Sequence, residues 1–265
     1  MSIAIEAIAA HIPKDRLSNI ERAAEFGIDE KFIAQKLGVE KVSRMAPNDD
    51  TADLAERAVR ALGDRFQPAD IECLVVCTQN PHGHGIPHTS AVLHGRLGLT
   101  DHCACFDIGL GCSGYVYSLS VVSAFMQSNG FSKGLLVTCD PYSKILNPAD
   151  RNTIMLFGDG ATVTLLSPEG QLVPTLFEFA TRGADGPALH NDSGELFMNG
   201  RAVFNFSNTR VPEQIRKLLH RAELTVDDVD WFIFHQGSRF IVDQLTRRLK
   251  VPPEKVPLRL LEHGN

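Results

Sequence analysis

Phe106-Asp-Ile-Gly-Leu-Gly-Cys-Ser-Gly-Tyr115 decides the fold, because a short strand there runs through a glycine-rich turn into a helix. Cys112 lies where that helix is expected to begin. Helix starts present unpaired N–H groups and the positive end of the helix dipole, and both stabilise a thiolate. Gly111 and Gly114 let backbone and substrate approach closely. The pattern favours Cys112 as a nucleophile activated by its position. The usual interpretation of a cysteine, an inert buried side chain, is kept for the other five, namely Cys73, Cys77, Cys103, Cys105 and Cys139.

Strands and helices alternate on both sides of this turn. Apolar runs rich in β-formers predict strands near 2–10, 71–77, 104–108, 134–139, 153–157, 161–166, 231–235 and 256–260. Helical spacing and capping residues predict helices near 17–25, 29–37, 51–65, 88–98, 113–128, 200–222 and 239–249. The helix at 113–128 has small or apolar residues on nearly every face, so it is expected to be buried. The alternation indicates an α/β architecture, with sheets covered by helices.

Composition excludes several classes of protein. Of the 265 residues, 43% are hydrophobic and 22% charged, which is ordinary globular usage. No apolar run approaches the roughly 18 residues that span a bilayer, and the N-terminus reads directly into a strand rather than a secretory signal. The net charge of −6 argues against a nucleic-acid binder. We therefore expect a cytoplasmic protein with no membrane and no nucleic-acid partner.

Four segments, in order along the chain, resemble the signatures of the β-ketoacyl-acyl carrier protein synthase III family. They are residues 104–114, 150–161, Phe234-His-Gln-Gly237 and His263-Gly-Asn265. The resemblance implies a thiolase-like five-layered αβαβα fold built from two similar halves and usually assembled as a homodimer. The halves would span 1–168 and 169–265. Family members continue for several tens of residues beyond the asparagine, so the second half is expected to be incomplete at its C-terminus.

The same resemblance implies a chemistry. Cys112 would accept an acyl group from acyl-coenzyme A and pass it to malonyl-acyl carrier protein in a decarboxylative Claisen condensation, with no metal or redox cofactor. His235 and Asn265 match the family's other two catalytic positions and would hydrogen-bond the malonyl thioester oxygen. A histidine at the end of a strand is more often structural, but the context Phe-Ile-Phe-His-Gln-Gly before a helix favours catalysis here.

The binding residues rest on family positions alone. Phe32 and Arg151 match the residues that hold the adenine of coenzyme A, and Ser238 is a further substrate-binding candidate. Ile86 replaces a bulky aromatic on a loop that, in the family, reaches across the dimer to the partner's acyl pocket. The predicted contacts of the carrier protein are Arg239, Arg247 and Arg248, for which a solvated helix face is an equal alternative.

Three alternatives stay open. His82, His84 and His88 suggest a metal site, but no carboxylate or cysteine stands beside them at ligand spacing. The chain could instead transfer the acyl group to oxygen or nitrogen, or act as a ketosynthase of specialised metabolism, since those relatives share the catalytic residues. It could also be a non-catalytic thiolase-fold subunit that supports a partner.

Overall fold

A computed structural model describes residues 2–265 of the chain, which group by their contacts into two compact units. The first unit comprises residues up to 15, 45–141 and 159–177, and the second comprises 16–44, 142–158 and 178–265. Two stretches of the N-terminal portion thus pack with the C-terminal portion. The division into thiolase halves at 168/169 stays a prediction.

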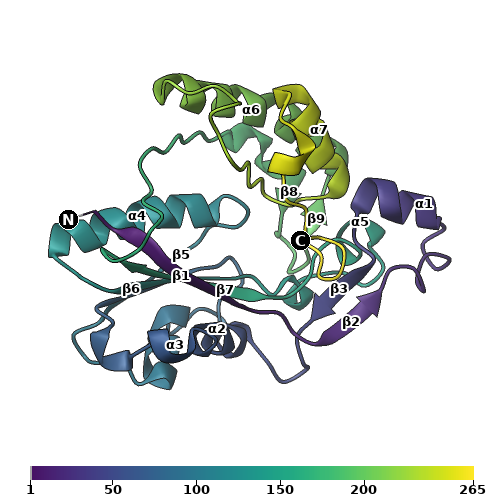
Figure 1. Ribbon diagram of the computed structural model, residues 1–265. Coiled ribbons are helices and arrows are strands. Elements are labelled where there is room, and N and C mark those ends of the chain that lie inside the picture. Colours follow the sequence, from purple (N-terminus) through teal and green to yellow (C-terminus); the bar gives the residue numbers. More distant parts are fainter. Residues whose placement is uncertain (1) are drawn as a thin grey trace. The chain divides into compact units, whose positions relative to one another are not determined.

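The helices and strands of the first unit enclose one sheet. They are β1 (Ala4–His11), α2 (Thr51–Arg60), η2 (Gly63–Arg65), η3 (Pro68–Asp70), β4 (Cys73–Cys77), α3 (Thr89–Leu97), β5 (Ala104–Ile108), α4 (Gly114–Asn129), β6 (Gly134–Cys139) and β7 (Ala161–Ser167). The five strands are ordered β1-β7-β6-β4-β5, with β4 parallel to both β5 and β6. Helices α2 and α3 cover one face and α4 the other (Figure 1). The strands expected near 2–10, 71–77, 104–108, 134–139 and 161–166 are all present.

The central strands are buried on both faces, as their apolar sequences require. Every residue of β4 is buried, which is typical of a parallel strand covered by helices on both sides. Its alternate side chains enter two cores: Leu74 and Val76 face α2 and α3, whereas Cys73 and Val75 face α4. The parallel register pairs β4 with its two neighbours over its whole length, so β4, β5 and β6 end at the same edge of the sheet.

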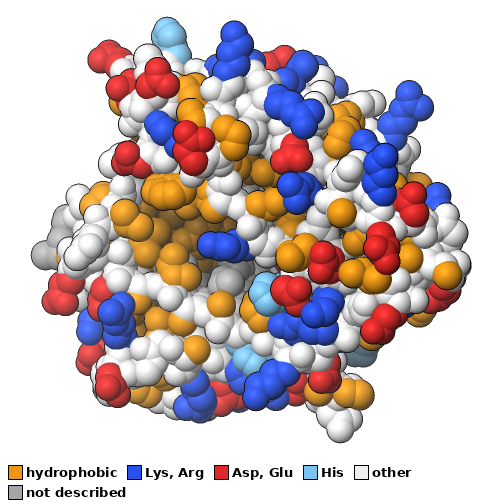
Figure 2. Space-filling model, turned by 45° about the vertical axis from the view of Figure 1, so that its right-hand side comes forward, with side chains coloured by type: hydrophobic (Ala, Val, Ile, Leu, Met, Phe, Trp, Pro, Cys, Tyr) orange, Lys and Arg blue, Asp and Glu red, His pale blue; other side chains and the backbone are white. Residues whose placement is uncertain are grey.

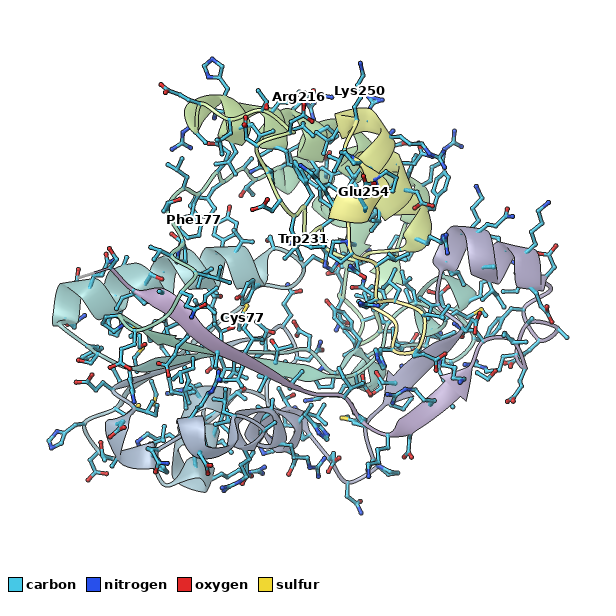
Figure 3. The ribbon with its side chains drawn as sticks, in the orientation of Figure 1. Cys77, Phe177, Arg216, Trp231, Lys250 and Glu254 are labelled. Carbon is cyan, nitrogen blue, oxygen red and sulfur yellow. The ribbon has the colours of Figure 1, made fainter. Side chains whose placement is uncertain are left out.

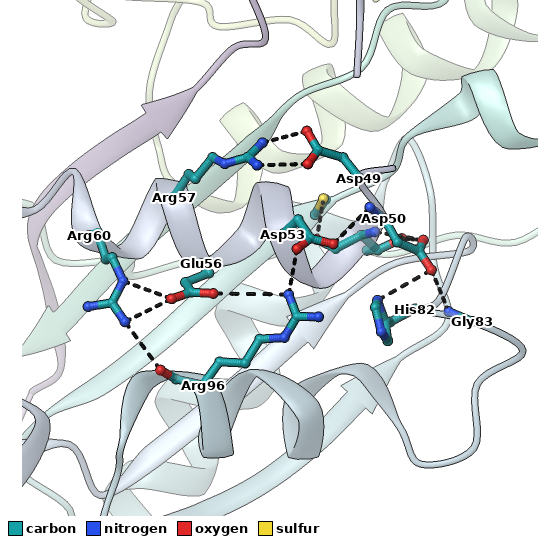
Figure 4. Close-up of polar contacts among 11 residues, drawn as sticks. Asp49, Asp50, Asp53, Glu56, Arg57, Arg60, His82, Gly83 and Arg96 are labelled. Carbon is teal, nitrogen blue, oxygen red and sulfur yellow. Dashed lines mark hydrogen bonds and ion pairs between the residues drawn. The ribbon is translucent and has the colours of Figure 1, made fainter. Parts of the chain in front are cut away.

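A polar network fixes the start of α2 and the loop that follows β4. Asp50 caps α2 in a reciprocal capping box with Asp53. Its Oδ2 also accepts the backbone N–H of Gly83 at 2.7 Å and lies 3.3 Å from Nδ1 of His82 (Figure 4). Arg96 of α3 pairs with Asp53 at 2.8 Å, which joins the two helices on this face of the sheet.

Helix α4 is only half buried, so the expectation of a fully buried helix was wrong. Leu119, Val122 and Met126 pack on the sheet. Val116 and Val121, on the opposite side, are 49% and 45% exposed. The sequence is apolar all round, but the unit's sheet covers only one of its faces.

The second unit is built mainly from helices and short hairpins. Its elements are β2 (Asp15–Ser18, all but its first residue), α1 (Glu30–Phe32), η1 (Ile33–Leu37), β3 (Lys41–Arg44), η4 (Tyr142–Lys144), α5 (Arg151–Ile154), η5 (Gly183–Ala188), β8 (Leu189–His190), β9 (Phe197–Met198), α6 (Gly200–Arg221), α7 (Arg239–Leu249) and η6 (Pro253–Lys255). The helices expected near 29–37, 200–222 and 239–249 are present, and α6 packs against α7 around a core that contains Phe232, Phe234 and Val242.

Four sequence expectations fail in this unit. Residues 17–25 form turns rather than a helix, except for the end of β2. Residues 153–157 are not a strand, because Asp150 caps a helical turn by accepting the N–H of Asn152 and the hydroxyl of Thr153. Residues 231–235 and 256–260 lie in no strand. They run beside each other through a few bonds, such as Phe232 N–H to the Lys255 carbonyl at 2.9 Å, rather than through a ladder.

Candidate active site

The carboxyl ends of three parallel strands place polar groups around Cys112. The loop 78–80 follows β4, Cys112 follows β5, and Asp140 directly follows β6. Ligand sites of open α/β sheets lie at this edge, because the loops after parallel strands converge there. All three segments belong to the first unit.

Cys112 lies immediately before the N-cap of α4, as the sequence predicted. The turn 109–113 carries Cys112, and the next residue, Ser113, is the N-cap. The Cys112 side chain is exposed. Gly114 seats the helix closely on β4: a Cβ at this position would lie 2.4 Å from Sγ of Cys77. Cys77 is buried at the end of β4 (Figure 3). Its thiol donates to the Leu110 carbonyl at 3.2 Å. A glycine at 114 is therefore needed to bring the helix start, and Cys112 with it, onto the strand ends.

The electrostatics at Cys112 differ from the expectation of a thiolate stabilised by position alone. Although its side chain reaches the surface, dense packing around the sulfur removes it from water, and this desolvation raises the pKa of the Cys112 thiol. The backbone N–H of Cys112 opposes that effect, and the charge of Asp140 adds to it. The shift favours the neutral Cys112 thiol over the thiolate.

Asp140 is a site residue that the sequence reasoning missed. Its Oδ1 accepts hydrogen bonds from Thr78 Oγ1 at 3.0 Å, Gln79 N at 2.7 Å, and Asn80 N and Nδ2 at 3.1 and 3.3 Å. Burial raises the pKa of this carboxyl, whereas the four donors lower it. The carboxylate ties the end of β4 to the end of β6. A carboxylate directly after a buried strand, at the edge that also carries Cys112, was the signal available in the sequence.

His235 ends an extended segment of the second unit. Phe232 and Phe234 are buried while Trp231, Ile233 and His235 are exposed, which is the alternation of a strand without its ladder. Although the His235 side chain reaches the surface, packing around the imidazole removes part of it from water, and this desolvation lowers the pKa of His235. That shift favours the neutral imidazole, which carries one N–H donor.

Gln236, next in sequence, fixes the end of that segment. Its Nε2 donates to the Pro257 carbonyl at 2.7 Å, and its Oε1 accepts the N–H of Arg259 at 2.7 Å. Ser238 then caps α7 by accepting the N–H of Ile241 at 3.2 Å. The backbone is thus fixed on both sides of His235. The buried Phe232 and Phe234 hold it before the histidine, and the hydrogen bonds of Gln236 and the Ser238 cap hold it after.

Asn265 is held by its backbone, also within the second unit. Its N–H donates to the Leu156 carbonyl at 2.8 Å, and its carbonyl accepts the N–H of Gly158 at 3.0 Å. The contact is too close for a side chain at Gly158, where a Cβ would lie 1.9 Å from the His263 carbonyl oxygen. Gly264, with φ +84°, makes the turn that brings Asn265 to this position. The placement of Cys112 with His235 and Asn265 in one site remains a prediction.

Comparisons with known proteins decide the family. The profile of 3-oxoacyl-[acyl-carrier-protein] synthase III matches residues 106–183, and the profile of its C-terminal portion matches residues 219–265. A β-ketoacyl-[acyl-carrier-protein] synthase III from Geobacillus kaustophilus is 33% identical over 268 residues, which cover 100% of this chain and 86% of that protein. Another from Sphingopyxis alaskensis is 31% identical over 270 residues, covering 96% and 83%. The chain belongs to the β-ketoacyl-acyl carrier protein synthase III family.

Solved structures agree with this assignment. The crystal structure of a 3-oxoacyl-(acyl-carrier-protein) synthase III matches with a TM-score of 0.93 at 32% identity, covering 100% of this chain and 87% of that one. The resemblance found in the sequence and the thiolase-like α/β fold are both confirmed. The chain is a condensing enzyme of the acyltransferase class.

The residues expected to bind substrate are mostly exposed. Phe32 is 42% exposed at the end of α1, and Arg151 begins α5 and donates to the Phe26 carbonyl at 3.2 Å. Ile86 is 94% exposed on the loop after β4. Asp50 anchors one end of this loop, and Asp107 of β5 anchors the other by accepting the first N–H groups of α3 at 2.7 and 2.9 Å. A well-anchored loop thus displays an apolar side chain that the rest of residues 2–265 leave almost uncovered.

The expected carrier-protein contacts lie along α7. Arg239 at its start is 3.7 Å from Asp243, and Arg247 and Arg248 are exposed in its last turn. Lys250 is the C-cap of α7, and Arg216 of α6 is a further cation of this unit; both are labelled in Figure 3. The arginines are solvent-exposed cations on one helix, which fits both the docking role and a solvated face.

Two general expectations concern metals and membranes. Within residues 2–265, no three histidine, cysteine, aspartate or glutamate side chains are grouped as metal ligands. Nδ1 of His88 instead contacts the Ser90 hydroxyl at 2.8 Å.

No helix in this described part of the chain has the length and apolar character to cross a bilayer. Figure 2 shows Lys and Arg side chains intermixed with Asp and Glu side chains on one face.

Proposed function

We propose that Cys112 carries the acyl group in a decarboxylative Claisen condensation between an acyl-coenzyme A primer and malonyl-acyl carrier protein. The sulfur attacks the primer's thioester carbonyl, the carbon–sulfur bond to coenzyme A breaks, and the thiol proton leaves with the released coenzyme A. The malonyl group then loses carbon dioxide, and its enolate carbon attacks the acyl-enzyme. A carbon–carbon bond forms, and Cys112 is released.

The observation that carries this proposal is the position of Cys112 just before the N-cap of α4, at the carboxyl ends of three parallel strands. The close contact between Cys77 and Gly114 sets that position. Backbone N–H groups at a helix start are suited to hold the oxyanion of the tetrahedral intermediate. This geometry supports nucleophilic catalysis rather than a structural thiol.

His235 and Asn265 act in the second step. An imidazole kept neutral by desolvation donates its N–H to the malonyl thioester oxygen, and the Asn265 amide supplies a second donor. Decarboxylation itself drives the condensation, so these residues and the thiol suffice without a metal or redox cofactor. We further propose that the enzyme works as a cytoplasmic homodimer in fatty-acid biosynthesis, with Phe32, Arg151 and Ser238 on the primer and Arg239, Arg247 and Arg248 on the carrier protein.

The test is acylation followed by chase. Intact-protein mass spectrometry after incubation with acyl-coenzyme A should show one acyl group on the unmodified chain and on Cys73→Ala, but none on Cys112→Ala. Malonyl-acyl carrier protein should then remove that group as a β-ketoacyl product. Full acylation of Cys112→Ala would refute the nucleophile. Release only by alcohols or amines would support acyl transfer to oxygen or nitrogen, and no acylation of any form would support a non-catalytic subunit.

A further inference from the structure

A pair of cysteines lies at the start of β5, outside the candidate active site. Cys103 directly precedes the strand and Cys105 is its second residue, and their sulfur atoms are 3.9 Å apart. Side chains two positions apart in an extended chain point to the same face. Both cysteines accordingly pack against the core beneath α2 and α3.

Cys73 is close in space but lies on the other face of the sheet. It pairs in register with Ala104 and belongs to the core beneath α4, with Val75 and Cys77. Burial raises its pKa to about 12. The two sulfurs of Cys103 and Cys105 therefore form a pair of their own.

The two thiols are chemically unequal. Cys105 is half-buried whereas Cys103 is only 8% exposed. The hydrogen bond between the two sulfurs lowers the pKa of Cys105, and His94 of α3 lowers it further, against the effects of desolvation and Asp107. The same hydrogen bond and burial raise the pKa of Cys103. Cys105 is the more accessible sulfur, so it is the one that a dissolved disulfide reaches first.

The two sulfurs are in contact, and bonding them requires a movement of the backbone beside Cys103. Two residues of extended chain span about 6.6 Å between Cα atoms, which is near the upper end of the range found across disulfides. The ladder with β4 begins at Ala104, and Cys103 is held outside it, where its N–H donates to the Thr100 carbonyl at 3.0 Å. A bond also requires the two Cβ atoms to approach to about 3.5–4.5 Å, so the backbone on the Cys103 side must leave the extended conformation when the disulfide forms. Strain of this kind makes a disulfide easier to reduce.

We propose that Cys103 and Cys105 form a dithiol site that disulfides of the glutathione class convert reversibly into an intrachain disulfide. The Cys105 thiolate attacks one sulfur of the oxidant, whose disulfide bond breaks to release one thiol. Cys103 then loses its proton, attacks Sγ of Cys105 and displaces the second thiol. Two protein thiols are oxidised, one small disulfide is reduced to two thiols, and excess reduced thiol reverses the sequence.

The experiment uses the full chain in glutathione buffers of graded oxidised-to-reduced ratio, trapped with N-ethylmaleimide under denaturing conditions. Intact mass and fragmentation spectra should show a bridge that removes two hydrogens and leaves only Cys103 and Cys105 unlabelled. Cys73→Ala, the matched control, should form the same bridge. Cys103→Ser should stop at a glutathione adduct on Cys105, and Cys105→Ser should leave Cys103 reduced. Circular dichroism confirms that each variant is folded.

Three results would overturn the proposal. One is a stable glutathione adduct on Cys105 of the unmodified chain, since Cys103 should displace it. Another is a bridge to any other cysteine. The third is a pair that stays reduced at the most oxidising ratio, while a dithiol peptide added to the same buffer shows that the oxidant was active. Because the readout is a covalent bond in the first unit, it does not depend on the condensing activity.

Discussion

Replacing Gly158 with alanine should displace Asn265 while leaving the chemistry at Cys112 intact. The new Cβ would lie 1.9 Å from the His263 carbonyl oxygen and 2.8 Å from Oγ of Ser43. The carbonyl is backbone and cannot rotate away, so the segment carrying Asn265 must move by about 1.5 Å to reach ordinary van der Waals contact. That movement breaks the hydrogen bond from the Gly158 N–H to the Asn265 carbonyl, which contributes about 1 kcal/mol.

The kinetic consequence should be confined to one step. Misplacing a catalytic group by 1 Å can lower the rate on the order of 100-fold, and loss of an oxyanion donor costs about 10²–10³. We therefore expect condensation with malonyl-acyl carrier protein to fall by about 10², while acylation of Cys112 stays within a few-fold of the unmodified enzyme.

The assay is single-turnover acylation followed by chase, with the melting temperature as a check on folding. Gly183→Ala is the matched control, because a Cβ there meets no atom within 4 Å. The double variant Gly158→Ala, Asn265→Ala should condense no more slowly than Asn265→Ala alone, since both remove the same donor. Condensation by Gly158→Ala near the unmodified rate would refute the reasoning, and so would additive losses in the double variant.

Three further predictions concern the candidate site. His235→Ala should still accept the acyl group but decarboxylate malonyl-acyl carrier protein about 10²–10³ more slowly, and an unchanged chase rate would remove His235 from the mechanism. Iodoacetamide should alkylate Cys112 with a pH midpoint above the roughly 8.5 of free cysteine, because burial raises its pKa; a midpoint near 7 would contradict that environment. If Ile86 lines the partner's acyl pocket, octanoyl-coenzyme A should be preferred to acetyl-coenzyme A, because each buried methylene contributes about 0.8 kcal/mol. Ile86→Phe should abolish this preference in kcat/KM, and an acetyl preference in the unmodified enzyme would refute the idea.

The first unit was largely predictable because its signals are local. The apolar run of β4 and the turn at Cys112 each encode an element without reference to distant residues. The register between parallel strands follows once those elements exist, and it places Cys112 at the strand ends. Asp140 was missed because one carboxylate after a strand is a weak signal, and its contacts become visible only when four donors from the loop after β4 converge on it.

The second unit was less predictable because strand formation depends on partners. The alternation at 231–235 is a true strand pattern, and its buried residues pack into a core. A ladder also needs a neighbouring strand, which the described residues do not supply. At 153–157 the β-branched and apolar residues favoured a strand, yet the cap formed by Asp150 stabilises a helical turn. Local capping geometry outweighs propensity when the segment is only a few residues long.

The environment of Cys112 favours an uncharged sulfur, which bears on how the enzyme divides its two steps. Desolvation and the charge of Asp140 both disfavour the thiolate, whereas an acyl thioester carries no charge and avoids both penalties. In the proposed mechanism, the same environment would therefore favour the acyl-enzyme over the thiolate. Proton loss would then accompany attack on the primer, and the uncharged thioester would persist until the enolate attacks. Removing the charge at Asp140 would favour the thiolate, but it would also release the loop after β4, so the carboxylate links the position of the site to its protonation state.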